Sequence, residues 1–172
     1  GFGNTTITNL VSNTGVVASD TAGVGLERRY LAAAGYGGDK AIFGFGNTTI
    51  TNLVSNTGVV ASDTAGVGLE RRYLAAAGYG GDKAIFGFGN TTITNLVSNT
   101  GVVASDTAGV GSKRDGLAAA GYGGDKAIFG YGYNSSFYSI TNLVSNTGVV
   151  ASNTTGVGTA RTDLAAAGFS LS

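Results

Sequence analysis

The sequence predicts an all-β fold built from tandem repeats. One 43-residue unit is written four times and fills all 172 residues, at 1–43, 44–86, 87–129 and 130–172. The unit is rich in Gly, Thr, Ser, Asn, Ala and Val, and short β-type runs alternate in it with turn sequences. A repeat of this length is typical of solenoids, propellers and arrays, in which no unit buries a core alone. We therefore expect residues 1–172 to form a single repeat domain.

Four short strands are predicted in each unit. Residues 31–36 form a small-residue strand, and residues 40–46, in which aromatic side chains alternate with Gly, form the second. Residues 50–55 and 59–62 are the third and fourth strands, because both are β-rich and they flank an Asn-Thr-Gly hairpin signal at 56–58. The expected unit is a small antiparallel sheet.

A helix is the alternative for residues 26–34, whose composition suits one on propensity alone. The third unit places Asp115-Gly116 in this segment and the fourth places Thr162-Asp163 there, and both pairs are poor helix formers. We therefore expect a non-helical connection before the first strand. This connection is called the leader segment, and its copies are residues 26–30, 69–73, 112–116 and 159–163.

Four antiparallel strands in about 40–50 residues match the size of a β-propeller blade. The Ala-rich strand suits the innermost position, because strands converge at a propeller axis and bulky side chains would collide there. Tyr36, Phe43 and Phe45 would then fill the spaces between neighbouring sheets, each contributing roughly 2–3 kcal/mol when buried. The expected fold is a β-propeller of four-stranded antiparallel blades.

The order of the parts in each unit resembles the kelch blade. Arg28 precedes the small-residue strand, a Gly-rich turn follows, the second strand ends in Gly44 and Gly46, and Asn52 begins the next strand. Phe45 splits the paired glycines, the outer Tyr and Trp of kelch are absent, and the period is short for that family. The resemblance implies a kelch-like propeller over the whole chain. The copies are also similar, more weakly, to repeat regions of viral or phage appendage proteins, which implies a virion-surface or extracellular location.

Differences between the copies mark the candidate binding positions. The first two units are identical, and the larger changes fall in the leader segments and in the loop after the second strand, where the fourth unit gains four residues at 133–139. In an up-and-down blade these two connections emerge on one face, where repeat proteins usually bind. Drift in exposed loops is the alternative. The candidate residues are Glu27, Arg29, Tyr30, Glu70, Arg72, Tyr73, Lys113, Asp115, Tyr133, Phe137 and Tyr138.

One arginine of the leader segment is present in every unit although its neighbours change. Repetition in every unit favours a structural role, with the guanidinium donating to loop carbonyls, over a ring of cations that binds an anion. These arginines are Arg28, Arg71, Arg114 and Arg161. Asp39-Lys40 also recurs, but neighbours in a strand point to opposite faces, so we expect the Asp to close a turn and not to form a paired site.

Composition excludes several function classes. Ten Lys and Arg balance ten Asp and Glu, which argues against a nucleic-acid binder. There is no Cys and no His, so we expect no disulfide, no metal site and no cofactor. No nucleophile is paired with a base, which argues against an enzyme. No apolar run approaches the roughly 18 residues that span a membrane, so no membrane insertion is expected.

The expected function is a non-catalytic interaction module that recognises a glycan or a protein, and a purely structural fibre or shell component is the alternative. The chain begins in a second strand and ends after a first strand, so a seam blade formed from both termini is expected. The copies could close as one ring, pair with a second chain, or continue as an array. Five sequons are glycosylation candidates in a secretory setting: Asn4, Asn47, Asn90, Asn134 and Asn153.

Overall fold

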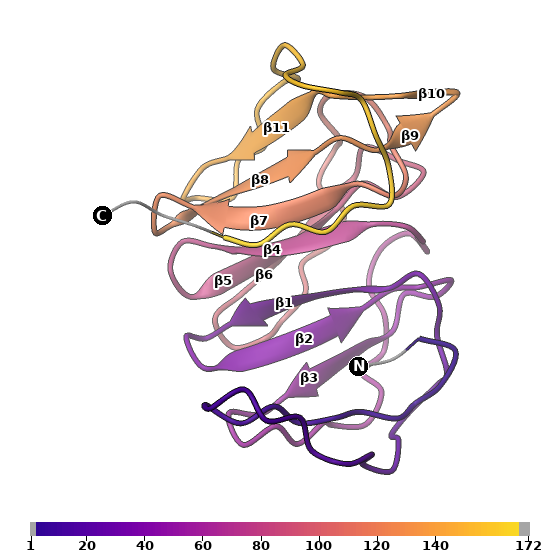
Figure 1. Ribbon diagram of the computed structural model, residues 1–172, viewed down its shortest axis with the longest axis vertical. Helices are drawn as coiled ribbons and strands as arrows, with labels where there is room; N and C mark the ends of the chain where they lie inside the picture. Colours follow the sequence, from indigo (N-terminus) through magenta and orange to yellow (C-terminus); the bar gives the residue numbers. More distant parts are fainter. Residues whose placement is uncertain (1–2, 169–172) are drawn as a thin grey trace.

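The computed structural model describes residues 3–168, and within them the protein is all β (Figure 1). None of these residues is helical, so the described chain has no helix that could cross a membrane. Three antiparallel sheets are ordered β1-β2-β3, β4-β5-β6 and β7-β8-β11, and β9 and β10 form a small hairpin. The strands are β1 (Ala32–Tyr36), β2 (Lys40–Gly44), β3 (Thr51–Val54), β4 (Ala75–Tyr79), β5 (Lys83–Gly87), β6 (Thr94–Val97), β7 (Ala118–Tyr122), β8 (Lys126–Gly130), β9 (Tyr133–Asn134), β10 (Ser136–Phe137) and β11 (Thr141–Val144).

The sheets fan out from a row of inner strands. The inner strand β4 lies between the inner strands β1 and β7 (Figure 1). In each sheet the second and third strands lead away from this row, as β2 and β3 do in the first sheet. A Cβ built on Gly78 would lie 3.6 Å from the carbonyl oxygen of Gly35, so the neighbouring inner strands are in van der Waals contact. Ala and Gly occupy these inner strands, as the sequence indicated.

The core lies between the sheets. Phe86 is fully buried, and its ring occupies the space above Gly44, where a Cβ would lie 2.6 Å from the ring. Phe45 of the first sheet meets Phe86 of the second edge to face, with centroids 5.2 Å apart. Phe88 and Phe129 repeat the contact at 5.1 Å. Each Gly–Phe pair thus locks one sheet onto the next, and each buried ring contributes roughly 2–3 kcal/mol.

The predicted fourth strand is not a continuous strand. Residues 59–62 pair with β3 through the bridge Val54↔Val60 and the hydrogen bond from Ala61 N to Leu53 O, 2.8 Å. The Asn52 side chain donates to Ala61 O at 3.1 Å, so a side chain takes a place in the ladder that backbone would otherwise fill. The sheets therefore have three strands and an irregular edge, and four-stranded blades are not confirmed.

Four units give three complete sheets within residues 3–168, with a partial unit at each end. The N-terminal segment forms its own bridges, Thr8↔Thr21 and Val11↔Val17, and packs against the first sheet. At the other end of the row, residues 164–168 run beside β7 (Figure 1). These partial units lie at opposite ends of the row, so a sheet shared by both termini is not assembled among the described residues of this chain.

Candidate binding face

The leader segments converge at one end of the molecule. Tyr30, Tyr73, Gly116 and Asp163 are equivalent positions of the four units, and together with the following leucines they line a depression of about 210 Å³. Their backbones form a ladder in which each amide donates to the preceding unit: Tyr73 N to Tyr30 O at 3.0 Å, Gly116 N to Tyr73 O at 3.1 Å, and Asp163 N to Gly116 O at 2.8 Å. The position that differs between copies is therefore gathered into one surface, here called the leader face.

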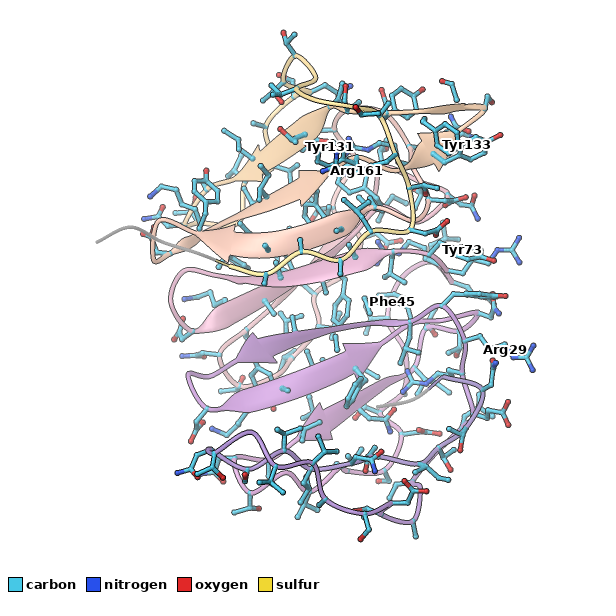
Figure 2. All side chains as sticks on the ribbon, viewed as in Figure 1. Arg29, Phe45, Tyr73, Tyr131, Tyr133 and Arg161 are labelled. Atoms are coloured by element: carbon cyan, nitrogen blue, oxygen red, sulfur yellow. The ribbon has the colours of Figure 1, made fainter. Side chains whose placement is uncertain are left out.

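Figure 2 shows the extent of the leader face. Arg29, Tyr73 and Tyr133 project from the same end of the molecule. The turns that join β1 to β2, β4 to β5 and β7 to β8 lie at the opposite end (Figure 1), here called the turn face. The charged candidates of the leader segments are exposed to solvent: Glu27, Arg29, Glu70, Arg72 and Lys113.

The tyrosines of the leader face have an unfavourable backbone conformation. Tyr30 has φ = 58° and Tyr73 has φ = 54°, and the equivalent Gly116 and Asp163 have φ values of 57° and 54°. Left-handed φ costs a side chain such as Tyr about 1–2 kcal/mol, whereas Gly adopts it freely and Asp tolerates it. The third and fourth units thus carry residues that suit the backbone, and the first two units carry residues that do not.

Positive φ also occurs at three aromatic residues that are held by contacts, and one of them, Tyr131 (φ = 63°), is half-buried, donates to Val157 O at 3.2 Å and lies under the Arg161 guanidinium. Phe45 and Phe88 have φ values of 65° and 64°, and both side chains are fully buried between sheets. Tyr30, by contrast, is 45 % exposed. It stacks on Tyr73 with centroids 4.1 Å apart and an interplanar angle of 30°. Packing therefore accounts for the buried pair, whereas the stacked tyrosines are strained and still accessible, a combination common at functional sites.

Charged and polar groups surround the stacked tyrosines. The Arg72 guanidinium lies 6.0 Å from the Tyr73 ring centroid, and Glu70 and Arg72 border a small cavity of about 110 Å³ with Asn47. Hydrogen bonding to Tyr30, followed by burial, raises the pKa of the Tyr73 hydroxyl, so it stays protonated at neutral pH. The site thus combines an aromatic surface with donors and acceptors around it.

The inserted loop of the fourth unit forms the β9–β10 hairpin at the edge of the leader face. Tyr133 and Phe137 are 43 % and 57 % exposed, with ring centroids 5.4 Å apart. Tyr133 exchanges backbone hydrogen bonds with Asp115 at 2.8 and 2.9 Å, which attaches the hairpin to the third leader segment. Tyr138 is half-buried, and its amide donates to Gly132 O at 2.9 Å. Two exposed rings therefore extend the aromatic surface.

Asp115 is turned toward the protein. Its carboxylate accepts a hydrogen bond from the backbone N–H of Asn90 at 2.5 Å. Burial raises the pKa of Asp115, and this hydrogen bond opposes the rise only in part. Among the predicted residues, Asp115 and Tyr138 thus have structural contacts, whereas Tyr30, Tyr73, Tyr133 and Phe137 face outward or line the depression.

The repeated arginine joins adjacent sheets in the second and third units. Arg71 donates to Ile93 O at 2.9 Å and to the Asn95 side chain, and its guanidinium lies 4.3 Å from the ring centroid of Phe45 in the preceding sheet. Asn95 in turn donates to Asp106 at 2.9 Å. Burial lowers the pKa of Arg71 to about 10, although the negative charge of Asp106 acts to raise it. The side chain therefore stays charged at neutral pH.

The four arginines are not equivalent in their surroundings. Arg28 and Arg114 make the same kind of contacts as Arg71, and all three are buried. Arg161 is exposed, donates to Thr159 O at 3.0 Å and lies 3.8 Å from the Tyr131 ring centroid. All three buried guanidiniums donate to loop carbonyls, and those of Arg71 and Arg114 also lie over a phenylalanine ring of the preceding sheet. This is the geometry expected of a structural arginine.

The candidate glycosylation residues have different environments. Asn4, Asn47 and Asn90 are exposed, and Asn134 is half-buried in β9. Asn153 stands where Asp63 and Asp106 stand in other units, and its side chain accepts from Asn142 at 3.0 Å and donates to Ser112 at 2.9 Å. Asn153 therefore already has a structural role.

A second cavity lies among residues that do not differ between the copies. This basin, of about 400 Å³, lies on the turn face and is lined by repeated Tyr, Lys and Gly residues. These residues do not differ between the first three units, so a search for differences could not select them. Their repetition on one face is the signal that remains in the sequence.

The lysines of this basin are neutralised. Each ammonium group forms an ion pair with the Asp that precedes it, at 2.9 Å for Lys40, 2.7 Å for Lys83 and 2.9 Å for Lys126. The expectation that these neighbours cannot pair was wrong, because the Asp lies in the turn just before the strand and the long Lys side chain folds back to it. The basin therefore has no excess positive charge.

No family model and no curated protein matches this sequence. Virginiamycin B lyase from Staphylococcus aureus has a similar structure, with 10% sequence identity and a TM-score of 0.51 over 85% of this chain and 47% of that chain. A fungal alcohol oxidase of the AA5 family in complex with copper has 10% sequence identity and a TM-score of 0.46, and the match covers 91% of this chain and 48% of that chain. A protein of unknown function from Bacteroides caccae has 10% sequence identity and a TM-score of 0.48, and the match covers 92% of this chain and 57% of that chain.

This chain spans about half the length of each of these structures. At such low identity the likeness to the lyase concerns the fold alone. It agrees with the three fanned antiparallel sheets, and the protein is therefore similar in fold to β-propellers.

Proposed function

We propose that this protein is a non-catalytic binding module that recognises a glycan through the leader face. The observation that carries the proposal is the pair Tyr30 and Tyr73, which stack in the open at a position where the backbone favours Gly or Asp. Strain that packing does not offset is a pointer to function. The first two units keep the strained tyrosine, and the third and fourth units have Gly116 and Asp163, which relieve the strain.

The chemistry of the leader face suits a sugar. The C–H faces of a pyranose are apolar and pack against aromatic rings, while its hydroxyls need donors and acceptors nearby. Tyr30, Tyr133 and Phe137 supply exposed rings and Tyr73 supplies a half-buried one. Glu70 and Arg72 supply polar groups beside Tyr73. Tyrosine offers a large contact area with few rotatable bonds, which limits the entropy lost on binding.

The proposal includes the finer architecture and location. We propose a kelch-like blade, supported by the repeated Arg that joins neighbouring sheets and by the small-residue inner strand. An extracellular or virion-surface location accords with a chain of zero formal net charge whose leader face presents exposed aromatic rings. A non-catalytic role is supported by the sequence, which has no His or Cys and no nucleophile beside a base.

An array of neutral oligosaccharides tests the proposal. The intact chain is expected to bind a defined subset of the glycans, and the double variant Tyr30→Gly, Tyr73→Gly to lose that signal while it stays folded. The variant Val102→Gly, Val149→Gly, at two exposed residues of hairpins outside the leader face, is the matched control and should leave the pattern unchanged. Binding that survives in the double variant would refute the role of the leader face. Absence of any signal, together with large assemblies in light scattering, would favour a purely structural fibre or shell component.

A further inference from the structure

One apolar contact recurs wherever a sheet of the row meets the hairpin of the next. A leucine of the first packs over the glycine of that hairpin, so a Cβ built on the glycine would run into the leucine side chain. The separation would be 2.8 Å for Gly101 with Leu53 and for Gly148 with Leu96, and Gly58 with Leu10 is closer still. These glycines therefore leave room for a leucine of the preceding unit.

A hydrogen bond from the leader segment accompanies this contact. The first amide of each leader segment donates to an oxygen at the end of the following hairpin: Leu26 N to Asp63 Oδ2 at 3.0 Å, Leu69 N to Asp106 Oδ2 at 3.0 Å, and Ser112 N to Asn153 Oδ1 at 3.3 Å. Three successive junctions thus use the same pair of contacts, and the third shows that Asn can replace Asp as the acceptor.

The first unit exposes the receiving half of such a junction. Val11 is 63 % exposed, whereas the equivalent Val97 and Val144 are fully buried in the clusters between sheets. Among the described residues, no atom lies within 4 Å of a Cβ built on Gly15, the equivalent of Gly58. Asp20, the equivalent of Asp63, accepts from the Asn9 side chain, but no described leader segment donates to it. The receiving face consists of Val11, Gly15, Val17 and Asp20.

The other end of the row exposes the donating half. Tyr122 is half-buried, whereas the equivalent Tyr36 and Tyr79, which lie against the hairpin glycines of the next sheet, are each only 4 % exposed. Val157 is 76 % exposed, against 36 % for the equivalent Val67. Within residues 3–168, no Asp or Asn of a following sheet stands before the amide of the fourth leader segment. The donating face consists of Tyr122, Leu143, Val157 and Thr159.

The two faces fit each other by the contacts already used inside the chain. Gly15 offers the space into which Leu143 and Tyr122 would pack, and Asp20 offers the acceptor for the Thr159 amide. The faces lie at opposite ends of the row (Figure 1), so a single chain does not bring them together, whereas two chains can. A contact between unlike faces closes into a ring or continues as a filament.

We propose that the receiving face of one copy binds the donating face of a second copy, and that two copies close a ring head to tail. The number two is favoured because this chain spans about half the length of the propeller-like lyase, so two copies supply one fold of that size. The proposal concerns assembly and stands apart from glycan binding at the leader face.

Sedimentation velocity of the full chain over a range of concentrations tests the proposal, and the expected particle has twice the mass of one chain. Gly15→Asn should weaken pairing at least about tenfold, because Asn tolerates the positive φ but fills the space for Leu143. Gly81→Asn is the matched control, since Gly81 has φ = 80°, and within the described chain no atom lies within 4 Å of its Cβ. This variant should pair as the parent does.

The hydrogen-bond acceptor provides a second test. Asp20→Ala should weaken pairing about tenfold, because the Thr159 amide would be buried without a partner. Asp20→Asn should restore pairing, since Asn153 accepts the equivalent hydrogen bond from Ser112. Circular dichroism checks that each variant is folded.

A mixing experiment shows whether the contact is head to tail. Leu143→Glu damages the donating face, so this variant alone should pair weakly. Mixed with Gly15→Asn it should recover pairing in part, because one junction of the mixed pair has two native faces. A single-chain mass at every concentration, assemblies of more than two copies, equal effects of the two glycine variants, or no recovery on mixing would overturn the proposal.

Discussion

At the scale of single residues, identical side chains in equivalent positions have different energetic roles. Arg71 is buried between two sheets and bound to a carbonyl, an asparagine and an aromatic ring. Arg161 keeps the ring contact but is exposed and donates only to Thr159 among the side-chain hydrogen bonds described. Repetition in sequence therefore does not fix the environment, which depends on whether a neighbouring sheet follows.

Substituting these two arginines by Met tests this difference. Arg71→Met should lower the free energy of unfolding by about 3 kcal/mol, because it leaves buried polar partners unsatisfied. Arg161→Met should cost about 1 kcal/mol or less, the scale of an exposed cation–π contact. Urea denaturation followed by circular dichroism measures both. Equal losses for the two variants would contradict the assigned structural role of the buried arginine.

At the scale of elements, strands could be predicted where side-chain size dictates the position. The first three predicted strands lie within one or two residues of β1, β2 and β3. Side-chain size is decisive at the end of β2, because a Cβ on Gly44 would lie 2.6 Å from the Phe86 ring. β2 ends at Gly44, before the predicted end, since Phe45 adopts φ = 65°. Neither this conformation nor the side-chain bond from Asn52 that disrupts the fourth strand follows from propensity, because both depend on the neighbouring strand.

The contact between Gly44 and Phe86 is a prediction at this scale. Gly44→Ala should lower the free energy of unfolding by about 1–3 kcal/mol through overpacking against the buried ring. Phe86→Leu creates space, so the double variant should be more stable than the sum of the two single effects. Gly35→Ala is the control, because its Cβ would make only an ordinary contact of 3.6 Å. Additive effects of the two substitutions would contradict the proposed packing.

The Asp–Lys turns predict a pH dependence of stability. The Lys83 hydrogen bond, followed by that of Asn99, lowers the pKa of Asp82, and the Asp82 hydrogen bond raises the pKa of Lys83. A lowered Asp pKa stabilises the fold above the unfolded value of about 3.9, and this is lost as pH falls through the folded value. A raised Lys pKa stabilises it below about 10.4, and this is lost as pH rises through the folded value.

The variant Asp39→Asn, Asp82→Asn, Asp125→Asn isolates these turns. It should be less stable than the parent chain at pH 7, and the difference should shrink toward pH 2 as the parent carboxyls become protonated. Thermal unfolding at pH 7, 4 and 2 measures the difference. A difference that is constant over this range would show that the substitutions act through some effect other than the ion pairs.

At the scale of the whole molecule, the two ends have separate characters. The leader face collects the positions that differ between units, and the turn face repeats one set of residues in each sheet. The gathering of Tyr30, Tyr73, Gly116 and Asp163 at one end could be predicted from blade topology. The positive φ of this position could not be predicted from the tyrosines of the first two units. Gly116 and Asp163 at the same position in the other units did indicate it, because both residue types tolerate positive φ. The basin escaped prediction because its residues are repeated without change.

The most direct test of the central claim is to measure stability and glycan binding together in the variant Tyr30→Gly, Tyr73→Gly. The relief of left-handed strain and the lost ring stacking are each of about 1 kcal/mol, so the free energy of unfolding should change by no more than about 1 kcal/mol. Binding to the glycans that the parent chain selects on the array should fall at least about tenfold. A variant that binds those glycans as the parent does, or that loses as much stability as Phe88→Ala at about 3–5 kcal/mol, would contradict the account.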